Sequence, residues 1–151
     1  MIQRVQSLFL LIVVAFSLLL MVLPIYEFPE IAAQLPVDTT ASVALVKSYS
    51  IGDNTLLSII NGAVGLLSLV AILLFKNRNL QVRLANVNLL LICVLIGLLF
   101  FLADTMGSSL NHRVSYQYGS YLPLIQLVFT FLAIRAIRKD DELVRSADRL
   151  R

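Results

Sequence analysis

Hydrophobic residues of this chain fall into four long runs separated by polar segments. Such runs predict membrane-spanning helices, because a helix needs about 20 apolar residues to cross a bilayer, whereas soluble core helices have apolar runs of about 10 to 14. The predicted spans cover residues 6–26, 55–75, 80–103 and 120–138. Charged residues make up 14% of the chain and its mean hydropathy is +0.89, in agreement with this pattern. We therefore predict one domain over residues 1–151, an all-α membrane protein built as a four-helix transmembrane bundle.

The first apolar run follows a short basic start and therefore also fits a secretory signal peptide. However, the sequence after Leu23 continues as PIYEFP, and the small pair Ala32-Ala33 lies too far downstream to serve as a cleavage site. We expect an uncleaved first span that ends near Pro24.

Two segments between the spans have a strand-like pattern. Residues 39–51 are rich in β-branched side chains, and residues 114–118 alternate between apolar and polar positions. Both segments lie on the same side of the predicted bundle. We therefore expect them to pair as a small β-hairpin or sheet formed from the two outer loops.

The distribution of basic residues predicts the orientation of the bundle. Of the 12 Lys and Arg residues, only Lys47 and Arg113 fall in the two outer loops, and the other ten fall on the side of the termini. Basic residues are retained in the cytoplasm during insertion. We predict that both termini are cytoplasmic and that the protein is a multi-pass protein of a bacterial inner membrane. The five tyrosines all fall on the outer side, where they suit either the membrane interface or packing within the loops.

Small and polar residues inside the spans predict how the helices pack. Ser58, Gly62 and Gly65 are spaced by four and three residues, so they share a helix face that another backbone can approach closely. Asn61 lies beside that face. Asn61 and Gln126 both lie in the outer third of their spans, so we expect these two amides to bond to each other. The polar residues expected inside the spans as contacts between helices are Asn61, Asn86, Asn88, Gln126 and Thr130.

The last residues predict a helix that leaves the membrane and continues into the cytoplasm. No Gly or Pro follows Pro123, so the fourth helix extends over the charged segment 139–151. One face carries a stripe spaced by three and four residues, formed by Arg135, Arg138, Glu142, Arg145 and Arg149. The opposite face carries Ile137, Leu143, Val144, Ala147 and Leu150. Three interpretations remain open: a solvated helix end, binding of the Arg stripe to anionic lipid headgroups, or docking of a protein partner or a second copy.

The sequence offers no recognisable chemistry of catalysis. It contains no nucleophile–base pair and no glycine-rich phosphate loop, and its one cysteine (Cys93) and one histidine (His112) cannot supply zinc-ligand spacing. We predict that the protein is not an enzyme, holds no cofactor or metal, and binds the lipid bilayer but no nucleic acid.

Three stretches resemble a known family. MIQRVQSLFLLI at the start, FKNRNLQVRL between the second and third spans, and YLPLIQLVFTFLAIRAIRKDDELVRSADRLR at the end resemble the domain-of-unknown-function family numbered 4293. The resemblance implies a small four-helix inner-membrane protein from Bacteroidota, and it implies no activity and no catalytic residues.

We predict a structural or accessory membrane protein, a subunit or scaffold that presents the charged cytoplasmic helix and the acidic outer loops to partners. The alternative is a component of a small oligomeric channel or transporter, with a polar path lined by Asn61 and Gln126. No Asp, Glu, Lys or His lies deep in a predicted span, and such residues usually mark ion and proton paths. The sequence therefore favours the accessory role.

Overall fold

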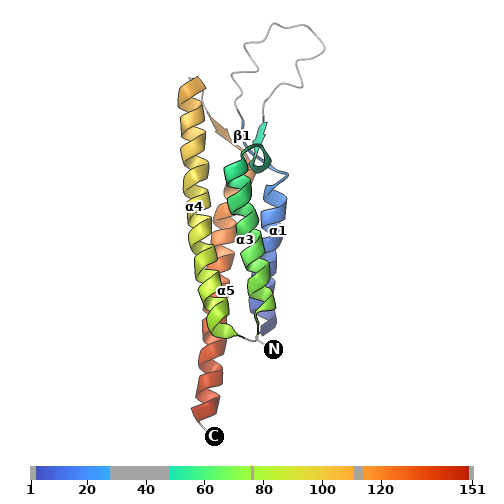
Figure 1. The fold of residues 1–151 in the computed structure, drawn as a ribbon, viewed down its shortest axis with the longest axis vertical. Coiled ribbons are helices and arrows are strands. Elements are labelled where there is room, and N and C mark those ends of the chain that lie inside the picture. The colour runs from blue at the N-terminus through green and yellow to red at the C-terminus, as the bar shows by residue number, and fades with distance from the viewer. Residues whose placement is uncertain (1–2, 28–47, 76, 111–113, 150–151) are drawn as a thin grey trace.

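The computed structural model describes residues 3–27, 48–75, 77–110 and 114–149. Within these ranges the chain forms four α-helices: α1 (Gln3–Leu20), α3 (Thr55–Leu73), α4 (Arg78–Leu110) and α5 (Leu122–Arg149). Figure 1 shows them side by side along one axis, with the N- and C-termini at the same end. The main contacts run from α1 to α3, α3 to α4, α4 to α5 and α5 back to α1, which confirms the predicted four-helix bundle.

Three of these helices, α3, α4 and α5, are long and apolar enough to cross a membrane. The first helix is shorter than predicted, because it ends at Leu20 and its apolar part covers only Val5–Leu20. At about 1.5 Å per residue, the 18 residues of α1 reach about 27 Å. Pro24 disfavours helical backbone at the residue before it, so the chain leaves the helix before residue 26.

The third helix is longer than predicted and continues to Leu110 instead of ending at residue 103. Its last two turns contain polar side chains that bond within the helix. The Thr105 hydroxyl donates to the Phe101 carbonyl at 2.8 Å, and the Ser108 hydroxyl donates to the Thr105 carbonyl at 3.0 Å. Polar side chains satisfied in this way allow the helix to extend beyond its apolar part.

A three-stranded antiparallel sheet covers the end of the bundle opposite the termini. It consists of β1 (Pro24–Glu27), β2 (Ser48–Ser50) and β3 (Ser115–Tyr116) in the order β2-β1-β3. Strands were predicted in both loops, and β2 and β3 fall inside the predicted segments, of which residues 39–47 lie outside the described residues. Their direct pairing was wrong, because β1 lies between them and pairs with both. We call this end of the bundle the sheet end, and the end with both termini the tail end (Figure 1).

Local interactions fix the junction between the sheet and the helices. Asn54 caps α3, as its side-chain oxygen accepts hydrogen bonds from the backbone N–H groups of Leu56 at 3.0 Å and Leu57 at 3.4 Å. A short 3-10 helix, η2 (Tyr118–Tyr121), leads into α5. A Cβ at Gly119 would lie 2.4 Å from the Pro24 carbonyl oxygen, so only glycine allows η2 to lie this close to β1.

The interior of the bundle alternates between apolar and polar layers. One apolar cluster lies under the sheet around Leu20, Ile51 and Leu57, a second contains Val13, Val64 and Ile92, and a third, nearer the tail end, contains Leu10, Ala71 and Ala133. Along each helix the buried polar residues fall between these clusters or beyond the third. The buried polar residues of the four helices are Gln6, Ser17, Asn61, Ser68, Gln81, Asn88, Gln126, Thr130 and Asp140.

Candidate functional site

Two helices are tied together at the tail end by an ion pair. Arg78, the first residue of α4, approaches Asp140 of α5, with 3.3 Å between Nη2 and Oδ2. The side chains are 22% and 11% exposed. The contact is electrostatic, since Asp140 Oδ2 accepts no hydrogen bond in the described part of the chain. The carboxylate of Asp140 on α5 is therefore buried against a cation of α4, Arg78.

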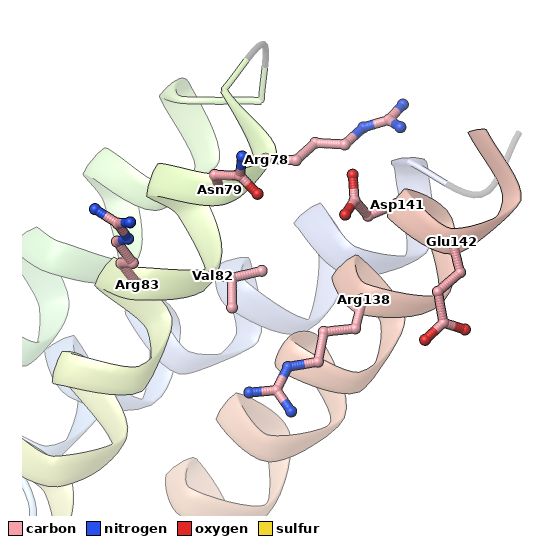
Figure 2. A pocket seen from close by; sticks show the side chains of 7 residues that line it. All are labelled: Arg78, Asn79, Val82, Arg83, Arg138, Asp141 and Glu142. Atoms are coloured by element: carbon pink, nitrogen blue, oxygen red, sulfur yellow. The ribbon is translucent and has the colours of Figure 1, made fainter. Parts of the chain in front are cut away.

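A cleft of about 470 Å³ lies beside this ion pair, between the first turns of α4 and the tail of α5. We call it the α4–α5 cleft. Figure 2 shows Asn79, Val82 and Arg138 turned towards the space between the two helices, and Arg78 extended across towards α5. The residues that line it are Arg78, Asn79, Val82, Arg83, Arg138, Asp141 and Glu142.

A second cleft of about 510 Å³ follows the surface of α5, and we call it the α5 groove. Its lining combines an apolar part with a cationic part. The lining residues are Phe131, Ile134, Arg135, Arg138, Lys139 and Glu142. Arg138 and Glu142 line both clefts, so the two sites adjoin along one stretch of α5.

The electrostatics of this region are dominated by arginine and lysine. Arg83, Arg135, Arg138 and Lys139 are exposed, whereas Arg78 is engaged by Asp140. The carboxylates of Asp141 and Glu142, which also line the clefts, offset part of the charge, and the surface of the two clefts together remains net positive. Exposed guanidinium groups present several donors in a planar fork that matches phosphate and carboxylate oxygens. The region is therefore suited to anionic groups.

The sequence-predicted tail residues are only partly brought together. Arg135, Arg138 and Glu142 all line the α5 groove, and Arg138 and Glu142 also line the α4–α5 cleft. Leu143 is 47% exposed. The backbone of α5 continues to Arg149, while the side chains of Val144, Arg145 and Arg149, and all of Leu150, lie outside the described residues.

The predicted face of small residues on α3 is correct at one position of three. A Cβ at Gly65 would lie 2.7 Å from Ser17 Oγ, so α1 and α3 approach closely there. Gly62 is exposed with nothing within 4 Å of such a Cβ, and the Ser58 hydroxyl donates to the Ile51 carbonyl at 2.9 Å. The face that meets α1 is centred on Asn61 and Gly65, and Gly62 is turned about 100° away from Asn61.

The predicted bond between Asn61 and Gln126 is wrong. The side-chain amide of Asn61 donates from Nδ2 to the main-chain carbonyl of Ser17 at 2.9 Å, and the Ser17 hydroxyl donates to the main-chain carbonyl of Asn61 at 3.0 Å. This reciprocal pair joins α1 to α3. Gln126 is 0% exposed, and neither its Nε2 nor its Oε1 has a partner in the described part of the chain.

Further amides lie nearer the tail end. Asn88 donates from Nδ2 to Ser68 Oγ at 2.8 Å, which joins α4 to α3, while Asn86 is exposed. Gln6 and Gln81 are also buried, and Gln6 Oε1 and both side-chain polar atoms of Gln81 have no partner among the described residues. Sequence reasoning missed these glutamines because they lie close to helix starts, where a polar residue ordinarily faces water.

One of the comparisons with known proteins identifies a family. No curated protein and no solved structure matches the chain. One family model, described as a domain of unknown function, matches residues 2–150, which is almost the whole chain. The resemblance seen in the sequence is thereby confirmed, and the chain belongs to the DUF4293 family.

Proposed function

We propose that the protein is an accessory membrane protein that crosses the cytoplasmic membrane four times and presents the tail of α5 to a partner protein on the cytoplasmic side. One observation carries this proposal. A single helix runs without interruption from the sheet end to Arg149 and extends beyond the other three helices at the tail end (Figure 1).

The tail of α5 is held in a fixed direction at its base. Ile137 is buried in the bundle, and Asp140 is paired with Arg78. Beyond this base, Leu143 and Ser146 are exposed. A helix that starts from a fixed base loses less conformational freedom on binding than a mobile tail, which favours docking into a groove on a partner.

The net positive charge of the tail end supports a cytoplasmic orientation through the retention of basic residues during insertion. The sheet end then faces outward, where α1 is continued by the buried strand β1. With α3 only 19 residues long, α1 at 18 residues matches its neighbour, which supports α1 as a span alongside α3.

The alternative role as a channel component requires a polar path. Asn61 and Gln126 are both 0% exposed within the single chain, so a path that they line would run through the bundle and not between subunits. Such a path would cross the apolar layer of Val13, Val64 and Ile92, all of which are fully buried. Presentation of the tail helix therefore agrees better with the packing.

The proposal is tested by crosslinking from native membranes. A photo-crosslinking amino acid at Leu143 should capture a defined protein, whereas the same amino acid at Leu66, which is exposed on α3, should not. Without crosslinking, the protein identified in this way should be lost from the Leu143→Ser variant during purification, and it should be retained by the Leu66→Ser variant. Equal capture from both positions, or retention by Leu143→Ser, would contradict the proposal.

A further inference from the structure

We propose that the α4–α5 cleft and the α5 groove together bind one anionic phospholipid that carries two phosphate groups joined by a glycerol, a diphosphatidylglycerol. One phosphate would occupy each cleft. This site uses residues of α5 up to Glu142, and it is separate from the later part of the tail to which partner docking is assigned.

The first argument is the position of the two clefts along the bundle. The α5 groove has Phe131 and Ile134 on the side towards the middle of the bundle, and Arg135, Arg138 and Lys139 on the side towards the tail end. Phe131 is 56% exposed. An apolar wall that ends in cations matches a phospholipid, whose acyl chains lie in hydrocarbon while its phosphates lie at the surface.

The second argument is how the cations are divided between the clefts. Arg83 lines only the α4–α5 cleft, Arg135 and Lys139 line only the α5 groove, and Arg138 lines both. Each cleft thus has a cation of its own besides the shared one. A lipid with a single phosphate would satisfy one cleft and leave the other without an anion.

The third argument concerns the acidic residues. Asp140 neutralises Arg78, and Asp141, which also lines the α4–α5 cleft, offsets one further cation there, so this cleft attracts a phosphate less strongly than the α5 groove does. Glu142 lines both clefts and therefore lies where they meet. A phosphate at that point would be repelled by the carboxylate. The hydroxyl of the linking glycerol would instead donate a hydrogen bond to it, which favours two separated phosphates over one central phosphate.

The test is native mass spectrometry of the full chain, purified in detergent, stripped of lipid and titrated with defined lipids. We expect one diphosphatidylglycerol per chain, bound more tightly than phosphatidylglycerol or inorganic phosphate. Removing one cation near a membrane surface weakens binding about fivefold. Arg138→Gln should reduce the affinity for diphosphatidylglycerol by at least this factor. Arg83→Gln and Arg135→Gln should each lower the affinity for diphosphatidylglycerol towards the affinity for phosphatidylglycerol.

The matched control is Ser146→Asp, which lowers the net charge by the same amount at an exposed position of α5 about two turns further along the helix. It should leave the affinity unchanged, and circular dichroism should show the same helix content for every variant. Equal binding of phosphatidylglycerol and diphosphatidylglycerol would overturn the proposal. So would an equal loss in Ser146→Asp and Arg138→Gln, because binding would then follow overall charge and not the two clefts.

Discussion

Replacement of Gln126 by methionine is expected to stabilise the bundle, although Gln126 is one of its most deeply buried residues. The side chain is fully buried, and both polar atoms of its carboxamide lack partners in the described part of the chain. A buried polar group without a partner costs about 1–3 kcal/mol. Methionine has nearly the same length and shape, and volume-conserving changes cost less than about 1.5 kcal/mol. The balance predicts a gain of up to about 3 kcal/mol in the free energy of unfolding.

The assay is reversible unfolding in mixed micelles, followed by circular dichroism as the fraction of denaturing detergent increases. The matched control is Asn61→Leu, which removes the 2.9 Å hydrogen bond to the Ser17 carbonyl. That variant should gain less than Gln126→Met does, because the loss of the hydrogen bond, worth about 0.5–1.5 kcal/mol, offsets the removal of Asn61 Oδ1, which has no partner in the described part of the chain. The two substitutions therefore have different predicted sizes in the same layer of the bundle.

The double variant separates the two amides. If Asn61 and Gln126 act independently, the effects of the two substitutions add to within about 0.5 kcal/mol. A loss of stability in Gln126→Met of more than about 1 kcal/mol would refute the reasoning. It would show that the carboxamide is hydrogen-bonded, and strong coupling to Asn61→Leu would identify Asn61 as the partner.

Three further predictions concern other parts of the bundle. Gly65→Leu should cost about 1–3 kcal/mol more than Gly62→Leu in the same unfolding assay, because a side chain at Gly65 meets α1 whereas Gly62 faces open space. Arg78→Gln should destabilise the protein by about 1–3 kcal/mol. This loss should exceed that of Asp140→Asn, because Arg78→Gln leaves the carboxylate of Asp140, the more buried of the two charges, without its partner. Burial, followed by nearby Tyr49 and Asp53, raises the pKa of the Tyr26 phenol above its ordinary value of 10.0. The folded state therefore keeps this proton longer than the unfolded state does, so the contribution of Tyr26 to stability should be fully present below about pH 10 and should be lost as pH rises further, measured by unfolding at a series of pH values.

The sequence was sufficient for the presence and order of the four helices, because long apolar runs are local signals, but not for the ends of α1 and α4. The absence of Gly and Pro after Pro123 predicted one continuous last helix. The end of the first helix was harder to place. The apolar run continues to Leu23, past the end of α1 at Leu20, and only pairing with two distant strands makes Pro24–Glu27 the strand β1.

The contacts between helices depend on rotation about each helix axis, which local patterns do not fix. A turn of about 100° separates Asn61, which faces α1, from Gly62, which is exposed. In the same way, the pairing of Arg78 with Asp140 joins residues from two helices that are far apart in the sequence. The candidate site at the tail end could therefore be predicted on α5 alone, and the contribution of α4 to it could not.

The central claim is that the tail end lies in the cytoplasm and the sheet end outside. The most direct test uses single cysteines in a Cys93→Ser background, introduced at Tyr118, which is 81% exposed at the sheet end, and at Ser146, which is exposed on the tail of α5. In intact spheroplasts, an impermeant maleimide should label the cysteine at position 118, and it should label position 146 only after the membrane is opened. Labelling of position 146 from outside, or of both positions from the same side, would contradict the account.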